Sequence, residues 1–185
     1  FYLGPAYFYL LAPFYFLTDG DPMAANYFNM LVNVFNTTML YFVVSRLLST
    51  RSGLIAAFLF SVSSYAIGKT MVPWNVSPIP GLSILIFYGL FRVSQNSVPW
   101  IYYLSFLSGF FLHLHFTAIF LPLIYLPVIL LVKSKKLFLK HFLFSIPLFL
   151  IWLAPTIIRD VGMSHDNFFR LKHFIRDYFI GFHLQ

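Results

Sequence analysis

Long apolar stretches separated by short polar connectors dominate this sequence. There are seven such segments, at roughly 2–17, 24–45, 53–67, 79–91, 99–112, 114–132 and 137–158. A helix needs about 20 apolar residues to cross a bilayer, and fewer when it is packed among other helices. Several segments are short and contain proline, which membrane helices tolerate where neighbouring helices replace the lost hydrogen bonds. The pattern predicts an all-α, polytopic transmembrane bundle with about six spans plus one interfacial helix.

The two ends of the chain differ from its middle. Eight of residues 1–17 are Phe or Tyr, and such rings favour the headgroup zone, so this segment is expected to be interfacial or half-inserted. Residues 167–182 place apolar and basic side chains alternately at helical spacing, which predicts an amphipathic surface helix or the lead into a further span. We therefore divide the chain into a partial transmembrane domain, 1–160, and an extracytoplasmic tail, 161–185, and expect a longer parent protein.

Composition supports a lipid environment. The chain is 60% hydrophobic, 22% aromatic and only 9% charged, whereas soluble domains carry about 25% charged residues. The absence of cysteine excludes disulfides and thiolate metal sites. The net charge of +7 does not predict nucleic-acid binding, because the basic residues lie between apolar runs and form no single stripe. We therefore expect an integral, multi-pass protein of a bacterial or archaeal cell membrane.

The charges also predict an orientation. Seven of the twelve Lys and Arg residues fall in connectors that alternate to the same side of the membrane: Arg46, Arg51, Arg92, Lys133, Lys135, Lys136 and Lys140. An excess of basic residues marks the cytoplasmic side. The opposite side receives Asp19, Asp21, Lys69, His113, His115, Arg159 and Asp160. Any polar chemistry is therefore expected on the non-cytoplasmic face.

One apolar segment carries a stripe of amides. Asn26, Asn29, Asn33 and Asn36 are three or four residues apart, which places them on one helix face. Two interpretations stay open. The amides could form interhelical hydrogen bonds, worth about 0.6 kcal/mol each, or they could line a polar substrate cavity.

A connector on the same predicted side brings a cation, an indole and an amide together. It contains Lys69, Trp74 and Asn75. A lysine can bind phosphate as a point charge, and an indole can stack on a sugar. The alternative is an interfacial tryptophan beside a lysine that extends its charge to water.

The next two corners on that side supply the remaining candidates. His113 and His115 lie two residues apart and so point to different faces of a helix. Either could contact phosphate or carry a proton, or be a buried histidine with satisfied hydrogen bonds. Arg159 precedes Asp160, and the guanidinium could hold a phosphate bidentately or form a local ion pair. No nucleotide-binding, nucleophile or metal motif is present. Because a metal ligand could also lie upstream of Phe1, the need for a divalent cation stays open.

Several stretches resemble a known family. Gly4-Pro5-Ala6-Tyr7-Phe8-Tyr9-Leu10-Leu11-Ala12-Pro13 resembles the aromatic stretch after the first external loop of protein-mannosyltransferase-like enzymes. Trp74-Asn75-Val76-Ser77-Pro78 and Gly109-Phe110-Phe111-Leu112-His113-Leu114-His115 follow in a similar order. Over roughly residues 1–160 the chain looks like the bacterial and archaeal members of the family 39-like glycosyltransferases.

This resemblance implies the GT-C membrane fold and sugar transfer from a polyprenyl-phosphate carrier to an acceptor at the outer membrane face. Membrane lipid is the other expected partner. In such enzymes an acidic residue of the first external loop is the general base, which is expected upstream of Phe1. The resemblance makes Lys69, Trp74, Asn75 and His115 candidates for lining the donor site.

Two other functions compete with the transferase. A transporter or flippase for a lipid-linked or small polar solute would need polar residues through the midplane and an internal repeat. The asparagine stripe favours it, whereas the lack of a repeat does not. A non-catalytic membrane scaffold is the third hypothesis. An acidic residue in the loop upstream of Phe1 would favour the enzyme.

Overall fold

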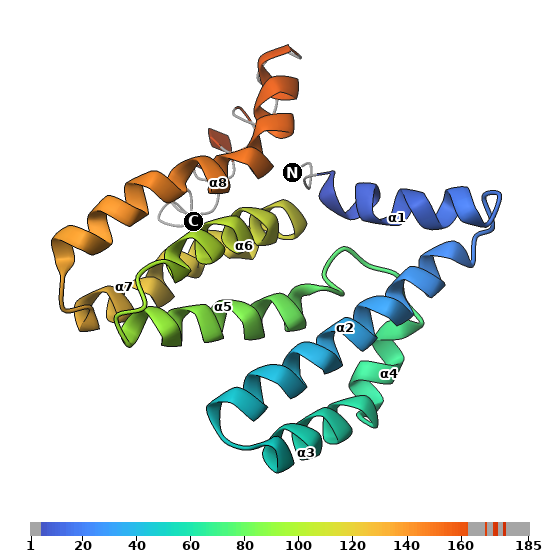
Figure 1. The fold of residues 1–185 in the computed structure, drawn as a ribbon. Coiled ribbons are helices and arrows are strands. Elements are labelled where there is room, and N and C mark those ends of the chain that lie inside the picture. Colours follow the sequence, from blue (N-terminus) through green and yellow to red (C-terminus); the bar gives the residue numbers. More distant parts are fainter. Residues whose placement is uncertain (1–4, 163–168, 170–171, 174–175, 177–185) are drawn as a thin grey trace, which may run out of the picture.

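The structure is a computed structural model that describes residues 5–162 together with 169, 172, 173 and 176. This part of the chain contains only helices and connectors, with no strand, which confirms the all-α prediction. The order is α1 (Ala6–Leu17), α2 (Ala24–Leu47), α3 (Thr50–Ser61), α4 (Ser64–Thr70), α5 (Ile79–Ser94), α6 (Trp100–Leu114), the 3-10 helix η1 (Phe116–Phe120), α7 (Leu121–Leu131) and α8 (Lys135–Gly162) (Figure 1).

Two helices have the length and composition of a membrane span. These are α2 with 24 residues and α8 with 28 residues. The other long apolar helices, α1, α5, α6 and α7, have 10–17 residues each. Large side chains remain exposed on the bundle surface, such as Phe16 and Leu130 at 84% and 77%. This exposed apolar surface fits a lipid environment. The expected total of about six spans stays a prediction, because only two helices are long enough by themselves.

Two segments expected as single helices are broken by capping side chains. The segment 53–67 divides into α3 and α4 because Ser63 Oγ accepts the N–H of Ala66 (3.4 Å) and starts a new helix. The segment 114–132 divides into η1 and α7. There His115 is extended (φ −152°, ψ 135°), and its Nδ1 accepts the N–H of Thr117 (3.3 Å). Hydrophobicity alone does not detect such breaks, since the residues on both sides are apolar.

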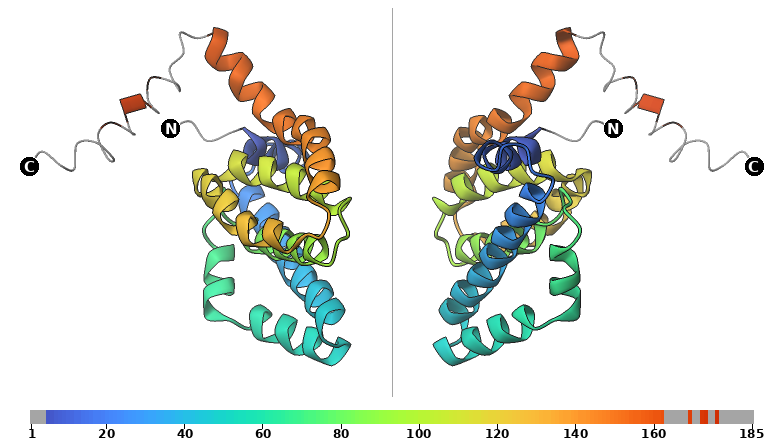
Figure 2. Two further views of the ribbon diagram at one scale, coloured as in Figure 1. Left: turned by 90° about the vertical axis from the view of Figure 1, so that its left-hand side faces the viewer. Right: turned by 90° about the vertical axis from the view of Figure 1, so that its right-hand side faces the viewer.

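Helix α6 is the centre of the packing. One buried cluster joins it to α5 and α7 through Ile86, Leu90, Ile101, Leu104 and Leu121. A second cluster joins α1 and α2 to the ends of α5 and α6 through Tyr7, Leu11, Phe28, Leu82 and Leu114. Helices α3 and α4 extend away from the α5–α8 group, attached along α2 (Figure 2). The fold therefore consists of a packed group, α5–α8, and a more open limb, α2–α4.

Small and polar residues hold α6 against α8. A Cβ added to Gly109 would lie 2.6 Å from the backbone oxygen of Phe149, so glycine alone allows this close approach. The same interface carries hydrogen bonds between Ser105 and Ser145 (2.6 Å) and between Tyr102 and His141 (3.0 Å). Close backbone packing and polar contacts of this kind drive helix association in membranes, where the hydrophobic effect gives no preference for a neighbouring helix over lipid.

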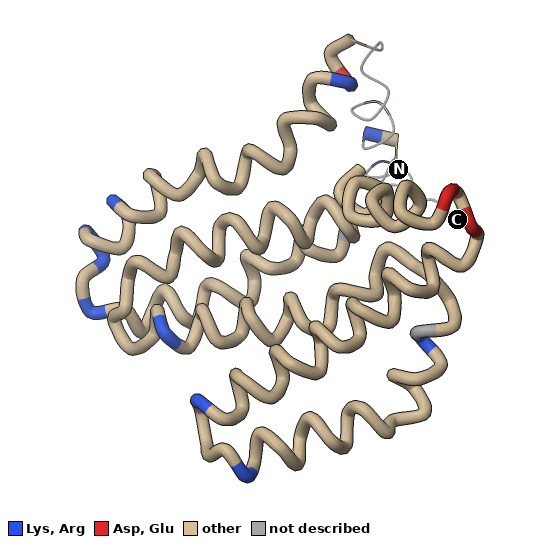
Figure 3. The backbone as a smooth tube through the Cα atoms, turned by 45° about the vertical axis from the view of Figure 1, so that its right-hand side comes forward, with Lys and Arg blue, Asp and Glu red and all other residues tan. Residues whose placement is uncertain are grey.

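The basic turns and the acidic α1–α2 turn lie at opposite ends of the bundle. The basic α2–α3, α5–α6 and α7–α8 turns share one end, and the acidic α1–α2 turn lies at the other (Figure 3). The main chain of Lys69 is hydrogen-bonded to Asn29 near the start of α2, whereas Arg46 is in its last turn. The 17-residue separation corresponds to roughly 25 Å along the helix. Lys69 is therefore far from the basic turns, as the orientation predicts.

The domain division concerns the two ends of the chain. Helix α1 places aromatic rings such as Phe8 and Tyr9 on its exposed face, a distribution compatible with the interfacial helix expected there. The amphipathic tail expected over 161–185 lies largely outside the described residues. The boundary at residue 160 stays a prediction.

The close approach at Gly109 generates a stability prediction. Gly109→Ala should lower the free energy of unfolding by about 1–3 kcal/mol, because the new methyl group would force α6 and α8 apart. Denaturant unfolding of the detergent-solubilised protein measures this. Gly68→Ala is the matched control, since nothing lies within 4 Å of a Cβ at that position. Equal stability of the two variants would contradict the close contact between α6 and α8 at Gly109.

Candidate functional site

The asparagine face of α2 fixes the connector between α4 and α5. Asn29 Nδ2 donates to the backbone oxygen of Lys69 (2.6 Å). Asn36 Nδ2 donates to the oxygen of Ser77 (2.9 Å), and its Oδ1 accepts the N–H of Gly81 (2.9 Å). Both asparagines are buried. These two amides therefore satisfy backbone groups at the end of α4, in the connector and at the start of α5, which is the hydrogen-bonding interpretation of the stripe.

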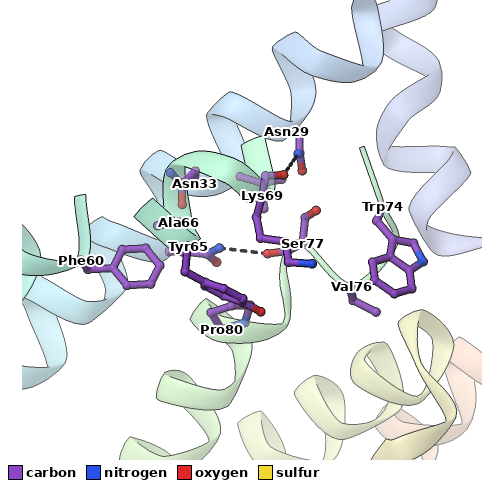
Figure 4. Close-up of a pocket in the computed structure, with 12 residues that line it drawn as sticks. Asn29, Asn33, Phe60, Tyr65, Ala66, Lys69, Trp74, Val76, Ser77 and Pro80 are labelled. Atoms are coloured by element: carbon purple, nitrogen blue, oxygen red, sulfur yellow. Dashed lines mark hydrogen bonds between the residues drawn. The ribbon is translucent and has the colours of Figure 1, made fainter. Parts of the chain in front are cut away.

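The same face also lines a small cavity. Asn29, Asn33 and Asn36 of α2 form one wall, and Tyr65, Lys69, Trp74 and Ser77 form another (Figure 4). The cavity volume is about 50 Å³, which is room for little more than one or two water molecules. A sugar phosphate could bind only across its mouth. We call this feature the Lys69 pocket.

Lys69 is exposed and lies between two aromatic rings. Its Nζ is 5.5 Å from the centroid of Tyr65 and 5.4 Å from that of Trp74. Cation–π contacts at exposed sites are worth about 0.5–1 kcal/mol each. They hold the ammonium in one region without neutralising its charge, so Lys69 can still attract an anion.

Sequence reasoning missed Tyr65 as part of this site. Tyr65 precedes Lys69 by four residues in α4, and residues at this spacing are neighbours on a helix surface. The signal was present in the sequence, but the residues were expected in a spanning segment and a connector. The break before α4 is what brings them into one short helix.

Asn75 has a structural position beside the pocket. It is 8% exposed, and its Nδ2 donates to the backbone oxygen of Leu114 at the end of α6. The bond joins the Lys69–Trp74 connector to the corner that carries both predicted histidines. Asn75 does not line the Lys69 pocket, whereas neighbouring Trp74 lines it and is half exposed.

His113 is a buried histidine with partners on both ring nitrogens. The N–H of Ala6 donates to His113 Nδ1 (3.1 Å), which requires that nitrogen to be unprotonated. Nε2 then carries the proton and donates to Oγ1 of Thr156 (3.2 Å). His113 therefore connects α1, α6 and α8 as a neutral imidazole, with no lone pair left for a metal and no N–H left for a phosphate.

His115 and Arg159 lie near this corner without joining the pocket. His115 caps η1, where its Nδ1 lies 2.9 Å from Oγ1 of Thr117. Arg159 is exposed in the last turn of α8, three residues after Thr156. Three residues are almost one helical turn. Because Thr156 contacts His113, Arg159 lies within about one turn of His113 along the axis of α8.

The structure thus brings together only part of the predicted set. Lys69 and Trp74 share a pocket, whose lining does not include Asn75, His113, His115 or Arg159. Of the four candidates for lining the donor site, Asn75 and His115 therefore do not line the pocket that contains Lys69 and Trp74. Among the described residues there is no group of three His, Asp or Glu side chains that could hold a metal ion.

The apolar helical bundle and its cationic, aromatic pocket at one end define a class: helical proteins of the membrane with a polar site near the surface. A family model described as dolichyl-phosphate-mannose-protein mannosyltransferase matches residues 3–158. The chain therefore belongs to this family, whose members are membrane glycosyltransferases that use lipid-linked sugars. No match to the chain was found among curated proteins or among solved structures.

The asparagine bonds generate a prediction about the connector. Asn36→Ala should destabilise the protein by about 1–3 kcal/mol, because Ser77 and Gly81 lose partners for buried backbone groups. Unfolding in denaturant measures the loss. Asn33→Ala is the control, since Asn33 lines the pocket on the same helix face and is only partly buried. If both variants lose equal stability, the connector does not depend on Asn36.

Proposed function

We propose that this protein transfers a sugar from a polyprenyl-phosphate carrier to an acceptor on the non-cytoplasmic face of the membrane, with the donor phosphate bound at the Lys69 pocket. One observation carries the proposal. An exposed ammonium lies between two aromatic rings, at the end of the bundle opposite the basic turns. Family membership supplies the reaction class.

The residues of the pocket suit a sugar phosphate. A hydrogen bond to a charged partner contributes about 1.5–3 kcal/mol, more than either cation–π contact. Lys69 would therefore favour a bound phosphate over the ring faces alone. When the sugar leaves, negative charge grows on the phosphate, and a fixed cation stabilises that charge most in the transition state. Trp74 offers a ring face for the sugar and Asn33 an amide for its hydroxyls.

The lipid part of the donor has an adjacent surface. Helices α3 and α4 expose large apolar side chains beside the pocket, including Phe58 at 63% and Tyr65 at 71%. We place the prenyl chain along this surface of the GT-C-like bundle, so that only the phosphate and sugar reach Lys69. We assign no residue of this chain as the base that activates the acceptor. The resemblance places that base upstream of Phe1, whereas Asp19 and Asp21 lie in the turn after α1.

The transporter hypothesis has less support. It relied on the asparagine stripe as a polar path through the midplane. Two of the four amides are bonded instead to the α4–α5 connector. Asn29 lies near the start of α2 and Asn36 near its middle, and both amides bond to backbone groups and not to one another along a continuous polar path.

Substitution of Lys69 tests the site. Lys69→Gln should lower kcat/KM for transfer from a polyprenyl-phosphate sugar by about 10- to 150-fold, the equivalent of one charge-assisted hydrogen bond. Lys69→Arg should keep much of the activity, because the charge remains. The measurement is initial transfer rate with the full-length protein in vesicles.

Lys140→Gln is the matched control, since it removes the same charge from an exposed lysine near the start of α8, beside the basic α7–α8 turn. It should leave the transfer rate unchanged. A Lys69→Gln variant that is as active as the Lys140→Gln variant would refute the proposed donor site and leave the family assignment intact.

The proposed topology has its own test. This chain has no cysteine, so single cysteines can be introduced for labelling in sealed vesicles with a membrane-impermeant maleimide. Asp19→Cys and Gly68→Cys should be labelled from one side, and Arg51→Cys and Lys136→Cys from the other. Labelling of Gly68→Cys and Lys136→Cys from the same side would exclude the arrangement.

A further inference from the structure

A large apolar groove lies between α6, α7 and α8. Its volume is about 440 Å³, and it extends from Leu112 on α6 to Ile129 on α7 and Phe142 on α8. The few polar atoms in it are largely bonded to protein, as in the contact between Ser108 and Tyr125. Such a lining offers no partner to a polar ligand and favours a hydrocarbon chain.

One end of this groove is basic. Four lysines occupy or flank the turn between α7 and α8: Lys133, Lys135, Lys136 and Lys140. Lys135 Nζ donates to the backbone oxygens of Leu130 (2.8 Å) and Ile129. Because the side chain of Ile129 lines the groove, the ammonium of Lys135 lies at its end.

The neighbouring turn adds a further cation. The N–H of Lys133 donates to Oδ1 of Asn96 (2.9 Å), which joins the α7–α8 turn to the α5–α6 turn. Arg92 ends α5 there, with its guanidinium 5.8 Å from the ring of Trp100. In the part of the chain that the structure describes, the acidic residues lie only in the α1–α2 turn and at the far end of α8. The basic end therefore keeps an uncompensated positive charge.

The register of α8 aligns the charge with the groove. Lys135 shares a helix face with Phe142, Ile146 and Phe149, because these spacings recur at helical periodicity. The last three side chains line the groove. They cover seven residues, or about 10 Å, and Lys135 is about another 10 Å further along the helix. The arrangement matches a molecule with an anionic head and a long chain.

We propose that the α6–α8 groove binds one anionic phospholipid, with an acyl chain in the groove and the phosphate at Lys135. Clusters of Lys and Arg next to membrane helices attract anionic lipids, and the apolar groove fixes one of them in place. This site is separate from the proposed donor site, since Lys69 is bonded near the start of α2 and the basic α2–α3 turn follows the end of that helix.

Native mass spectrometry of the full-length protein tests the proposal, with phosphatidylglycerol and phosphatidylcholine as probes. The wild type should retain one phosphatidylglycerol at least fivefold more tightly than phosphatidylcholine. Lys135→Gln should lower phosphatidylglycerol affinity about fivefold, the effect of one cation at the membrane surface, and leave phosphatidylcholine unchanged. Lys135→Arg should restore the preference. Arg51→Gln, which removes a cation from another turn at this end, should keep it.

A tryptophan that fills the groove provides a test that does not depend on the hydrogen bonds from Lys135 to the end of α7. Leu126→Trp should weaken binding of both lipids, because Leu126 lines the groove. Leu123→Trp is the matched control on the same helix, exposed and outside the groove lining. Equal retention of the two lipids by the wild type, or equal effects of the two tryptophans, would overturn the proposal. Displacement of phosphatidylglycerol by a polyprenyl phosphate would assign the groove to the donor instead.

Discussion

The structure depends on hydrogen bonds from buried side chains to backbone groups that no helix satisfies. In hydrocarbon an unpaired backbone group costs several kcal/mol, so every break in a helix needs a partner inside the bundle. Asn29 and Asn36 supply partners for the α4–α5 connector, and Asn75 supplies one for the end of α6. His113 does the same for the start of α1. These bonds decide where the non-helical segments lie, and those segments position the pocket.

The same bonds separate the structural residues from the candidates for chemistry. Asn75 and His113 are buried, and the observed bonds use the Nδ2 of Asn75 and both ring nitrogens of His113. Lys69, in the last turn of α4, and Trp74, in the connector after it, are exposed, and these bonds fix that connector. The backbone of Lys69 is therefore fixed by a hydrogen bond, whereas its ammonium is held only by weak contacts with two rings. Such contacts leave the charge available to a ligand.

Sequence reasoning could predict what depends on composition and periodicity. The low charged fraction predicted a membrane protein, and the spacing of the asparagines predicted one shared face. The alternation of the connectors predicted that Lys69 and Arg46 lie far apart, near the start and the end of α2. It could not predict contacts that depend on packing in three dimensions. The Ser63 cap that divides α3 from α4, and the bond that occupies Asn75, involve residues whose identity alone permits several roles. His113 shows this most clearly, because a ligand and a structural histidine look alike until both nitrogens are seen to be bonded.

The uneven distribution of cations gives the two ends of the bundle different tasks. Several lysines and arginines at one end produce a field that acts over about one Debye length, which is the property that the proposed orientation and the proposed lipid site require. A single lysine between Tyr65 and Trp74 produces little long-range attraction, but it defines a position for one charge. Transfer chemistry needs the second property, since a transition state is stabilised by a charge held in place. If both tasks fell at the same end, anionic lipid would compete with the donor for the same cations. Their separation by the length of a helix therefore favours a donor site at Lys69.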